Sequence, residues 1–579
     1  MSDDDEIAAR LEEFADLLDA KGVEYKPRAY RRAAENVRDH PGDVAALARE
    51  GEDAVRDVEG VGDAIASKIV EYVETGSIGE LEELRDELPV DMAALTRVEG
   101  VGPKTVGTLY EALEIRTLDD LEAAAEAGEI REVSGFGAKT EQNILENLEF
   151  AREAAERELL GEAHPRGESV VAYLEDRAAV ERVDLAGSLR RWKETIGDVD
   201  VLVGSADGGA VVDAFADWPA ADDVIEAGDQ KASVRAGGVR VDLRVVVPDE
   251  FGAALQYFTG SKDHNVALRN RAIERDLKLN EYGVFDVSGV DDPDADQRAG
   301  ERVAGETEAG TYEALGLPWI PPELRENWGE IEAAGAGDLP DLVEADAIRG
   351  DLHVHTDWSD GNATVAEMVE GAAQFGHDYV AITDHATGPG MVGGVGVPDE
   401  ELREQAEAVR AAAEDLPIEV FTGVEANVGT DGSVSVADDV LADLDLVVAS
   451  PHAGLDGDGT DRLVAAARHP GVDVVGHPTG RYLNRRSGLD VDVERLAAVA
   501  ADHGTALEVN ANPARLDLGG RAVKTAVEAG ATIAVNTDAH SPARYDLLRY
   551  GVHTARRGWA GPADVLSARD ADGVREFVA

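Results

Sequence analysis

The sequence predicts a multidomain protein in which an α-helical region, an α+β domain and a C-terminal (β/α) barrel follow one another along 579 residues. Three observations predict this order. Up to about residue 150, apolar residues at helical spacing alternate with glycine turns; from about 169 to 247, short β-rich runs are broken by helices; after about 345, strands and helices alternate regularly. At roughly 150 residues per domain, the length also favours several folding units, each with its own core.

The composition is strongly acidic, with 54 Lys and Arg, 119 Asp and Glu, and a formal net charge of −65. Disorder and adaptation to high salt both produce such a charge, but a hydrophobic content of 44% with clear periodicity argues against disorder. Lys is scarce, at ten residues, and the composition resembles that of haloarchaeal proteins. Because the Debye length is about 3 Å in molar salt, the acidity does not exclude DNA as a partner. We therefore interpret the protein as halophilic.

Cysteine is absent, which excludes disulfides, thiolate catalysis and Cys-ligated metal sites. Any metal must be bound by His, Asp or Glu. The N-terminus MSDDDEIAAR is acidic, whereas a secretory signal begins with basic residues and continues with apolar ones, and no run of 18 apolar residues occurs. We expect a soluble, cytoplasmic protein with no membrane association.

Three similar segments repeat in the N-terminal region: VEGVGDAIASKI at 58–69, VEGVGPKTVGTL at 98–109 and VSGFGAKTEQNI at 133–144. Each places a Gly-x-Gly turn before a helix, which lets the backbone approach closely and directs free amide N–H groups at a phosphate. A turn that only packs two helices together is the alternative, and a third copy makes it less favoured.

These segments resemble the helix-hairpin-helix motif of DNA repair proteins, which grips the phosphate backbone without reading its sequence. The resemblance implies two DNA-binding subdomains, at residues 1–88 and 89–150. It places the DNA contacts at Gly60, Gly62, Gly100, Gly102, Gly135 and Gly137.

The first repeat carries a further resemblance. RAYRRAA at 28–34 and GVGDAIASKI at 60–69 are similar to the small lyase domain of family X DNA polymerases, in which a Lys forms a Schiff base with an abasic sugar. The resemblance implies that Lys68 is this catalytic Lys and that Lys26 and Tyr30 bind phosphate. Ala64 stands where the family has a supporting basic residue, so the sequence supports 5′-phosphate binding better than lyase chemistry. A solvated helix Lys is the alternative for Lys68.

The central domain, at about 151–250, places carboxylates on one face of two strands. Asp198 and Asp200 alternate with valines in GDVDVLV, and Asp242 does so in VRVDLRVVV. Three carboxylates on adjacent strands would repel one another without cations, so we predict two Mg²⁺ ions that serve phosphoryl transfer. An acidic halophilic surface explains any single Asp equally well, but not the whole pattern.

Phosphate-binding and nucleotide-binding residues are predicted around these carboxylates. A glycine and a hydroxyl before a helix form a phosphate cradle, with two cations close by: Gly187, Ser188, Arg190 and Arg191. The spacing GS-x-RR-x5-GDVD resembles the nucleotidyltransferase superfamily, and YFTGSKDHN at 257–265 narrows the resemblance to family X DNA polymerases. It implies a palm, followed at 251–330 by a thumb-like subdomain. In that subdomain Tyr257, Phe258 and Gly260 border the sugar, and Asn265 and Arg269 meet the incoming base and the template.

Histidine is concentrated in the last part of the chain, where ten of the 13 lie after residue 345. After an acidic linker at 331–347, most of them follow short apolar runs, as expected at the C-terminal ends of strands in a barrel at 348–579. Together with neighbouring carboxylates they form a nine-ligand set, enough for three metals: His353, His355, Asp360, His385, Glu425, His452, His477, Asp538 and His540.

This pattern resembles the PHP domain, a (β/α)7 barrel that binds zinc or manganese and hydrolyses phosphate esters. By that resemblance the first metal takes His353, His355, Glu425 and Asp538. The second takes Glu425, His452 and His477, and the third takes Asp360, His385 and His540. Such a cluster lowers the pKa of bound water and supplies hydroxide at neutral pH.

The resemblance covers nearly the whole chain and implies a DNA repair polymerase that fills short gaps, as in base excision repair. It further implies 3′–5′ exonuclease, 3′-phosphoesterase or abasic-site endonuclease activity in the PHP domain. We expect a monomer that acts on gapped or nicked DNA and deoxynucleoside triphosphates. Two alternatives remain: a histidinol-phosphate-type phosphatase fused to an inactive nucleotidyltransferase, and a DNA-binding scaffold without activity.

Overall fold

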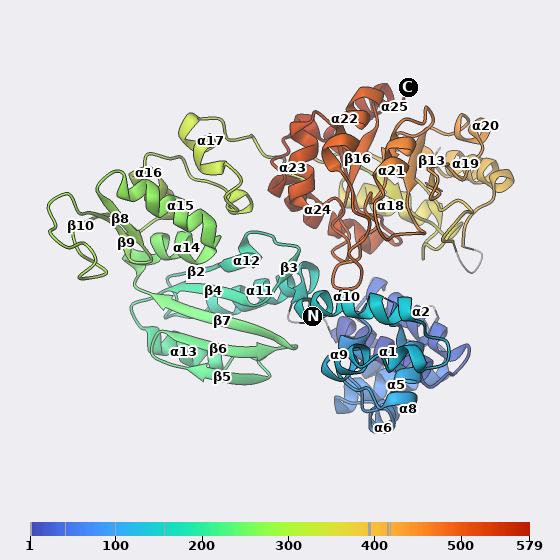
Figure 1. Ribbon diagram of the computed structural model, residues 1–579, viewed down its shortest axis with the longest axis horizontal. Helices are drawn as coiled ribbons and strands as arrows, with labels where there is room; N and C mark the ends of the chain where they lie inside the picture. Colours follow the sequence, from blue (N-terminus) through green and yellow to red (C-terminus); the bar gives the residue numbers. More distant parts are fainter. Residues whose placement is uncertain are drawn as a thin grey trace. The chain divides into compact units, whose positions relative to one another are not determined.

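The computed structural model describes residues 3–579 except 41, 59, 99, 156, 392–394, 414–415 and 417. The chain divides into two compact units. The first is built mainly from Met1–Arg157 and the second from Glu158–Arg481, Gly488–His540 and Tyr545–Ala579. Each unit is described by itself below, with the element labels of Figure 1.

The first unit is helical, and its turns fall at the predicted glycine repeats. Ile7, Leu11 and Phe14 lie at helical spacing and are buried in one core. Gly62 and Gly102 cap the N-termini of the helices that follow the first two repeats. The elements are α1 (Asp3–Ala20), α2 (Lys26–Asp39), α3 (Val44–Glu50), α4 (Glu52–Val55), α5 (Asp63–Thr75), α6 (Gly79–Glu87), α7 (Met92–Leu95), α8 (Pro103–Leu113), α9 (Leu118–Glu126), η1 (Ile130–Glu132) and α10 (Ala138–Ala155).

The palm in the second unit is a five-stranded sheet with strand order β2-β4-β7-β6-β5. The central strands β4 and β7 are parallel, and Asp200 pairs in register with Asp242. Strand β7 alternates buried and more exposed residues, as its sequence predicts. The elements are β1 (Glu158–Leu159), α11 (Leu160–Glu175), β2 (Arg182–Leu185), α12 (Gly187–Arg190), β3 (Thr195–Ile196), β4 (Val199–Gly204), α13 (Gly208–Ala216), β5 (Asp223–Ala227), β6 (Lys231–Ala236) and β7 (Val239–Val246).

A small α+β subdomain follows the palm, with a three-stranded antiparallel sheet of order β10-β9-β8. Helix α17 begins at Glu330, and its residues Ile331 and Ala334 pack in this subdomain's core beside Leu342. Residues 331–336 of the segment predicted as a linker are therefore helical. The elements are η2 (Pro248–Glu250), α14 (Phe251–Thr259), α15 (Lys262–Ile273), β8 (Leu277–Asn280), β9 (Gly283–Asp286), β10 (Glu301–Ala304), α16 (Glu308–Ala314), η3 (Pro322–Leu324) and α17 (Glu330–Ala336).

A buried ion network joins this subdomain to the palm. Glu308, 8% exposed, accepts hydrogen bonds from Arg190 at 2.7 and 3.1 Å, from Arg325 at 2.6 Å and from the Trp319 indole at 2.7 Å. Burial alone would raise the pKa of Glu308, but the charges and hydrogen bonds of Arg325 and Arg190 outweigh it and lower this pKa to about 2. Glu308 is therefore ionised and paired at neutral pH.

Replacing Glu308 by Ala destabilises the protein by about 3–5 kcal/mol, because the buried Arg325 guanidinium loses its counter-ion and the largely buried Arg190 loses its nearest one. The contribution of Glu308 is present above its unfolded pKa and is lost as the pH falls from about 4.5 towards 2. Urea denaturation followed by tryptophan fluorescence measures the loss, since Trp319 touches Glu308. As a control, Asp439→Ala removes an exposed ion pair with Arg403 and costs less than about 1 kcal/mol. Equal effects of the two changes would contradict this account.

The C-terminal part is a nearly closed barrel of seven parallel strands in the order β11 to β17, with Val354 bridging to Ala539 beside β17. The elements are η4 (Ala345–Ala347), β11 (Gly350–Val354), α18 (Val365–Phe375), β12 (Tyr379–Ile382), α19 (Asp399–Ala413), β13 (Glu419–Asn427), α20 (Asp438–Leu441), β14 (Leu446–Ser450), α21 (Thr460–Ala467), β15 (Val474–Val475), α22 (Val493–His503), β16 (Ala506–Asn510), α23 (Gly520–Glu528), β17 (Ile533–Asn536), η5 (Pro542–Leu547), α24 (Leu548–Arg557), η6 (Pro562–Asp564), η7 (Leu566–Ala568) and α25 (Ala571–Val578).

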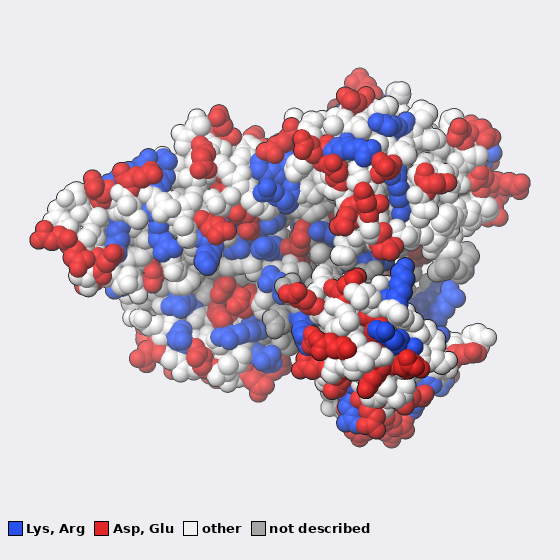
Figure 2. Space-filling view, in the orientation of Figure 1, with Lys and Arg blue, Asp and Glu red and all other residues white. Residues whose placement is uncertain are grey.

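The surface carries the acidic excess as a scattered pattern. In the face shown in Figure 2, acidic residues are spread over all parts of the chain and basic residues are interspersed among them. Among the helices of the described residues, none is long and apolar enough to cross a membrane.

Candidate active sites

The palm brings Asp198, Asp200 and Asp242 together. One carboxylate oxygen of each lies within 4.8 Å of the others. Asp200 and Asp242 come from the parallel strands β4 and β7, and Asp198 directly precedes β4, which begins at Val199. Burial, followed by the charges of Asp198 and Asp242, raises the pKa of Asp200 to about 7. A group of anions this close favours divalent cations held by oxygen ligands, so the residues fit Mg²⁺.

A cavity of about 160 Å³ lies against two of these carboxylates and is lined by Asp200, Ser233, Arg240, Asp242, Arg244 and Phe258 among others. Arg240 donates a hydrogen bond to Asp242 at 2.7 Å, and the Arg244 guanidinium lies 4.6 Å from the Phe258 ring centroid. The cavity therefore joins the metal-binding edge to cations and an aromatic face, which are the groups that bind a nucleotide.

The loop before α12 approaches the carboxylates closely. Gly187 has a φ of +60°, and a Cβ there would lie 2.0 Å from a carboxylate oxygen of Asp200. Only glycine therefore allows this approach without displacing a predicted metal ligand. Ser188 follows in the short helix α12.

Both predicted phosphate-binding arginines are engaged in the structure. Arg190 is held by Glu308, as described above. Arg191 donates from Nε to Glu326 at 3.0 Å and from Nη1 to the Thr259 carbonyl. The charge of Arg191 partly opposes the rise in the pKa of Asp200, so it reaches the carboxylate group.

The residues predicted to contact sugar and bases lie on α14 and α15. Tyr257 and Phe258 are half-buried with their rings edge to face at 5.2 Å. Gly260 ends α14, and a Cβ there would meet the Arg191 guanidinium at 3.2 Å. Asn265 donates to the Tyr257 carbonyl at 2.7 Å, and Arg269 is exposed.

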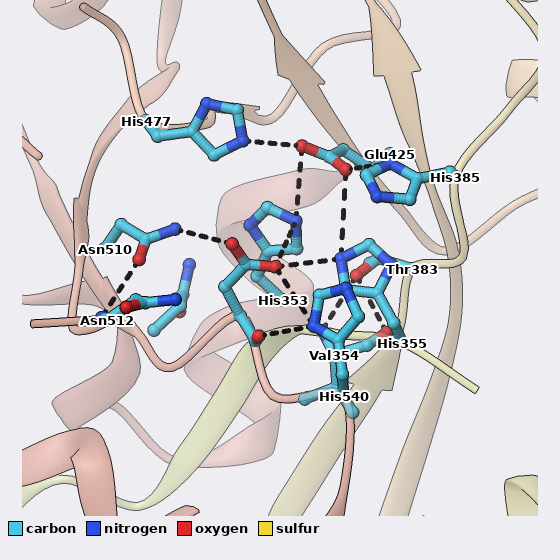
Figure 3. A network of polar contacts seen from close by, with 12 residues as sticks. His353, Val354, His355, Thr383, His385, Glu425, His477, Asn510, Asn512 and His540 are labelled. Carbon is cyan, nitrogen blue, oxygen red and sulfur yellow. Dashed lines mark hydrogen bonds and ion pairs between the residues drawn. The ribbon is translucent and has the colours of Figure 1, made fainter. Parts of the chain in front are cut away.

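The barrel gathers the nine predicted ligands at the C-terminal ends of its strands. Glu425 on β13 is fully buried at the centre, 2.5 Å from His385, 3.0 Å from His477, 3.3 Å from His452 and 3.4 Å from His353. Figure 3 shows the imidazoles of His353, His385 and His477 beside this carboxylate. Burial alone would raise the pKa of Glu425, but the imidazoles outweigh it and hold the pKa well below its usual value.

The remaining ligands complete the cluster on the side of β11 and β17. Asp538 lies 3.0 Å from His355, and Asp360 lies 3.3 Å from His540 and 3.6 Å from His385. His355, Asp360, His385 and His540 form one group whose ligand atoms lie within 4.8 Å of one another. The structure thus adds His355 to the set predicted for the third metal.

Orphaned buried atoms test whether this cluster fits metal ions. Among the described residues, His353 Nε2, His355 Nε2, His385 Nδ1 and both carboxylate oxygens of Glu425 lie at ion-pair distance from neighbouring ligand atoms, but none of them makes a hydrogen bond of regular geometry. Buried polar atoms left unpaired are costly unless another ligand satisfies them. Imidazole and carboxylate donors of this kind are those of zinc and manganese sites, so the residues fit.

The sequence did not single out Glu508, which orients two ligands from β16. Its carboxylate is fully buried, lies 2.7 Å from His353 Nδ1 and accepts a hydrogen bond from the His477 backbone at 2.6 Å. A carboxylate behind a ligating imidazole fixes the ring and raises its basicity. The only sequence feature that could have indicated this role is that Glu508 lies inside the otherwise largely apolar run ALEVN, at 506–510.

In the helical unit, all six glycines of the predicted DNA contacts are exposed. Gly60, Gly100 and Gly135 have positive φ values, and a Cβ at Gly62 or Gly102 would meet no heavy atom of the described residues within 4 Å. The space in front of Gly62, Gly100, Gly102, Gly135 and Gly137 is therefore open to a backbone phosphate, whereas a Cβ at Gly60 would lie 2.9 Å from the Asn36 side chain.

The predicted Schiff-base residue lies in an ion pair. Lys68 is 2.7 Å from Glu80, and its ammonium lies 5.1 Å from the Phe14 ring centroid. Tyr30 is buried, with its ring centroid 4.6 Å from that of Phe14 and tilted by 36°, whereas Lys26 is exposed. Burial would lower the pKa of Lys68, but Glu80 and Tyr30 outweigh it and raise this pKa.

Comparison with known proteins agrees with this architecture. Four family models match: a helix-hairpin-helix domain at residues 2–78, a SAM-like helix-hairpin-helix tandem at 92–149, the DNA polymerase beta thumb at 254–326 and the PHP domain at 351–512. The predicted fold class of helix-hairpin-helix region, α+β polymerase core with thumb and C-terminal PHP barrel is confirmed.

Relatives match over the whole chain or over about half of it. The chain is 35% identical to the DNA polymerase/3′-5′ exonuclease PolX of Bacillus subtilis, over 99% of both chains. It is 26% identical to DNA polymerase lambda of Rattus norvegicus, over 55% of this chain and 56% of the relative. It is also 26% identical to DNA polymerase lambda of Arabidopsis thaliana, over 48% of this chain and 54% of the relative. The chain therefore belongs to the family X DNA polymerases that carry a C-terminal PHP domain.

Proposed function

We propose that the protein is a DNA-directed DNA polymerase that fills short gaps and a metal-dependent exonuclease that trims DNA 3′ ends. The observation that carries this proposal is the presence of two separate metal-binding clusters, a carboxylate triad in the palm and an imidazole-rich cluster in the barrel. The full-length relative in Bacillus subtilis is named for both activities.

In the palm, Asp198, Asp200 and Asp242 would hold two Mg²⁺ ions. Bound there, the ions neutralise the charge that develops on the attacking and leaving oxygens of phosphoryl transfer. The residues Gly187 and Ser188 orient the triphosphate by backbone and hydroxyl contacts, and Arg191 exchanges its contact with Glu326 for a phosphate. Tyr257, Phe258, Gly260, Asn265 and Arg269 position the sugar, the base and the template.

In the barrel, the nine ligands would hold up to three zinc or manganese ions. Such ions supply hydroxide near neutral pH and polarise the phosphate ester. Glu425 sits between the groups of ligands, and Glu508 keeps His353 and the His477 backbone in place. Substrates of this site are a DNA 3′ end, a 3′-phosphate or an abasic site, the last of which would serve base excision repair.

The helical unit would hold gapped or nicked DNA through amides at the six glycines, with Lys26 and Tyr30 at a 5′-phosphate. We further infer that the protein is a halophilic, cytoplasmic monomer. The net charge of −65 supports salt adaptation, since molar salt screens the self-repulsion of so acidic a chain.

We propose that Lys68 serves 5′-phosphate binding rather than Schiff-base chemistry, because Glu80 lies 2.7 Å from its ammonium and raises its pKa, whereas Schiff-base formation requires a neutral amine. Borohydride trapping with a 5′-deoxyribose phosphate substrate is expected to yield no adduct at pH 7. Lys68→Ala is expected to weaken binding of a 5′-phosphorylated gap, with the same gap lacking the phosphate as control. A trapped adduct that disappears in Lys68→Ala would contradict this assignment.

The experiment that tests the proposed function compares DNA and small-molecule substrates in molar KCl. The purified protein is offered a gapped duplex with deoxynucleotides, the same duplex without them, and histidinol phosphate. We expect primer extension on the first and primer shortening on the second. Hydrolysis of histidinol phosphate without nucleotide incorporation would instead support the phosphatase alternative, and binding with neither reaction would support the scaffold.

A further inference from the structure

Side chains of the barrel contact the palm segment that carries Arg191. Arg557, the last residue of α24, donates from Nη1 to the Arg191 carbonyl at 2.5 Å and lies 3.2 Å from Glu326. Its side chain is 5% exposed, and the guanidinium lies 5.9 Å from the Trp328 ring centroid. Arg557 is therefore fixed on three sides, and two of its partners are Arg191 itself and the carboxylate that Arg191 binds.

The residue after Arg191 is fixed by the same helix. The Trp192 ring stacks between two imidazoles. Its centroid lies 3.5 Å from that of His553 on α24, with 4° between the ring planes, and 4.1 Å from that of His164 on α11. Its φ of +54° is a left-handed conformation that a bulky residue rarely adopts, and tertiary contacts are needed to hold it. Two residues later, Glu194 pairs with Arg481 of the barrel at 3.0 Å.

These contacts have a consequence for the palm, because the backbone of residues 191–192 sets the direction of the Arg191 side chain. Without Arg557, the Arg191 carbonyl loses a buried donor and Glu326 loses one of the two guanidinium groups that donate to it. Glu326 then binds Arg191 more strongly, and the turn is free to leave its strained conformation. Both changes draw the guanidinium away from a triphosphate in the palm.

We propose that Arg557 is a positioning residue for the polymerase reaction, through which the PHP barrel sets the orientation of the nucleotide-binding Arg191. The proposal rests on the polymerase function proposed above. It assigns the barrel a role in DNA synthesis that is independent of its metal cluster, since Arg557 lies on α24, outside the nine ligands.

The test is steady-state nucleotide incorporation on a one-nucleotide gap by the full-length Arg557→Ala, Arg557→Lys and wild-type proteins. We expect Arg557→Ala to raise the KM for the deoxynucleotide about tenfold or more, since small misplacements of a binding group carry such costs. Arg557→Lys should restore part of the nucleotide affinity, because Lys keeps a positive charge beside Glu326. It should not restore all of it, because an ammonium lacks the planar set of donors with which the guanidinium reaches both Glu326 and the Arg191 carbonyl. Primer affinity and 3′-end hydrolysis should stay at wild-type levels.

Arg495→Ala is the matched control, since Arg495 is an exposed barrel arginine paired with Asp461. An unchanged KM in Arg557→Ala would overturn the proposal. A raised KM together with a lowered kcat and equally slowed 3′-end hydrolysis in both Arg557 variants would also overturn it, because that result would show a purely structural role. A wild-type protein that incorporates no nucleotide would instead refute the proposed function, so the two failures are distinguishable.

Discussion

Replacing Asp242 by Ala abolishes DNA synthesis and leaves hydrolysis of DNA 3′ ends near the wild-type rate. Asp242 shares its carboxylate site with Asp198 and Asp200, so its loss removes one of the three carboxylates that would hold the proposed Mg²⁺ ions. Metal stabilisation of a phosphoryl transition state contributes several kcal/mol, and about 4 kcal/mol corresponds to a 10³-fold slower reaction.

The measurement is single-nucleotide incorporation on a gapped duplex, with 3′-end hydrolysis recorded for the same preparation. Asp213→Ala removes an exposed carboxylate of α13 in the same domain and serves as the control. It should leave both rates unchanged. Loss of both activities in a folded Asp242→Ala protein would contradict the independence of the two centres.

The second large effect is expected in the barrel, where His353→Ala combined with His355→Ala removes 3′-end hydrolysis and spares gap filling. Both imidazoles come from the end of β11, and both lie beside the buried Glu425 and Asp538. Their removal empties the proposed metal site on that side and so eliminates its activated water. We expect a loss of about 10³-fold or more in hydrolysis.

Metal content by elemental analysis provides a readout separate from activity, and it should fall in the double variant. His503→Ala, at the exposed end of α22, is the control and should retain both metal and activity. Hydrolysis at the wild-type rate in the double variant would show that the barrel cluster is not the exonuclease.

The strand faces, ligand positions and turns that the sequence predicted depend on local periodicity. Alternation along β7 placed Asp242 on the face opposite the buried valines, and apolar runs followed by His placed the ligands at strand ends. These patterns are visible within ten residues, so they need no knowledge of tertiary contacts. Glycine repeats before helices predicted the turns of the first unit for the same reason.

The parts that the sequence did not predict depend on partners far along the chain. Nothing in the sequence indicated that Arg190, for which triphosphate binding stays a prediction, contacts Glu308, 118 residues away. Glu508 contacts His353 across 155 residues, and Arg557 reaches the Arg191 carbonyl across 366. No spacing rule links such positions, since their contact follows from how whole subdomains pack.

The most direct test of two independent centres in one chain is the length distribution of a labelled primer on a gapped duplex, with and without deoxynucleotides, in molar KCl. The wild-type protein should lengthen the primer with nucleotides and shorten it without them. Asp242→Ala should shorten it in both conditions, and the His353→Ala, His355→Ala protein should lengthen it with nucleotides and leave it unchanged without them. A folded variant of either kind that leaves the primer length unchanged both with and without deoxynucleotides would contradict the independence of the two centres.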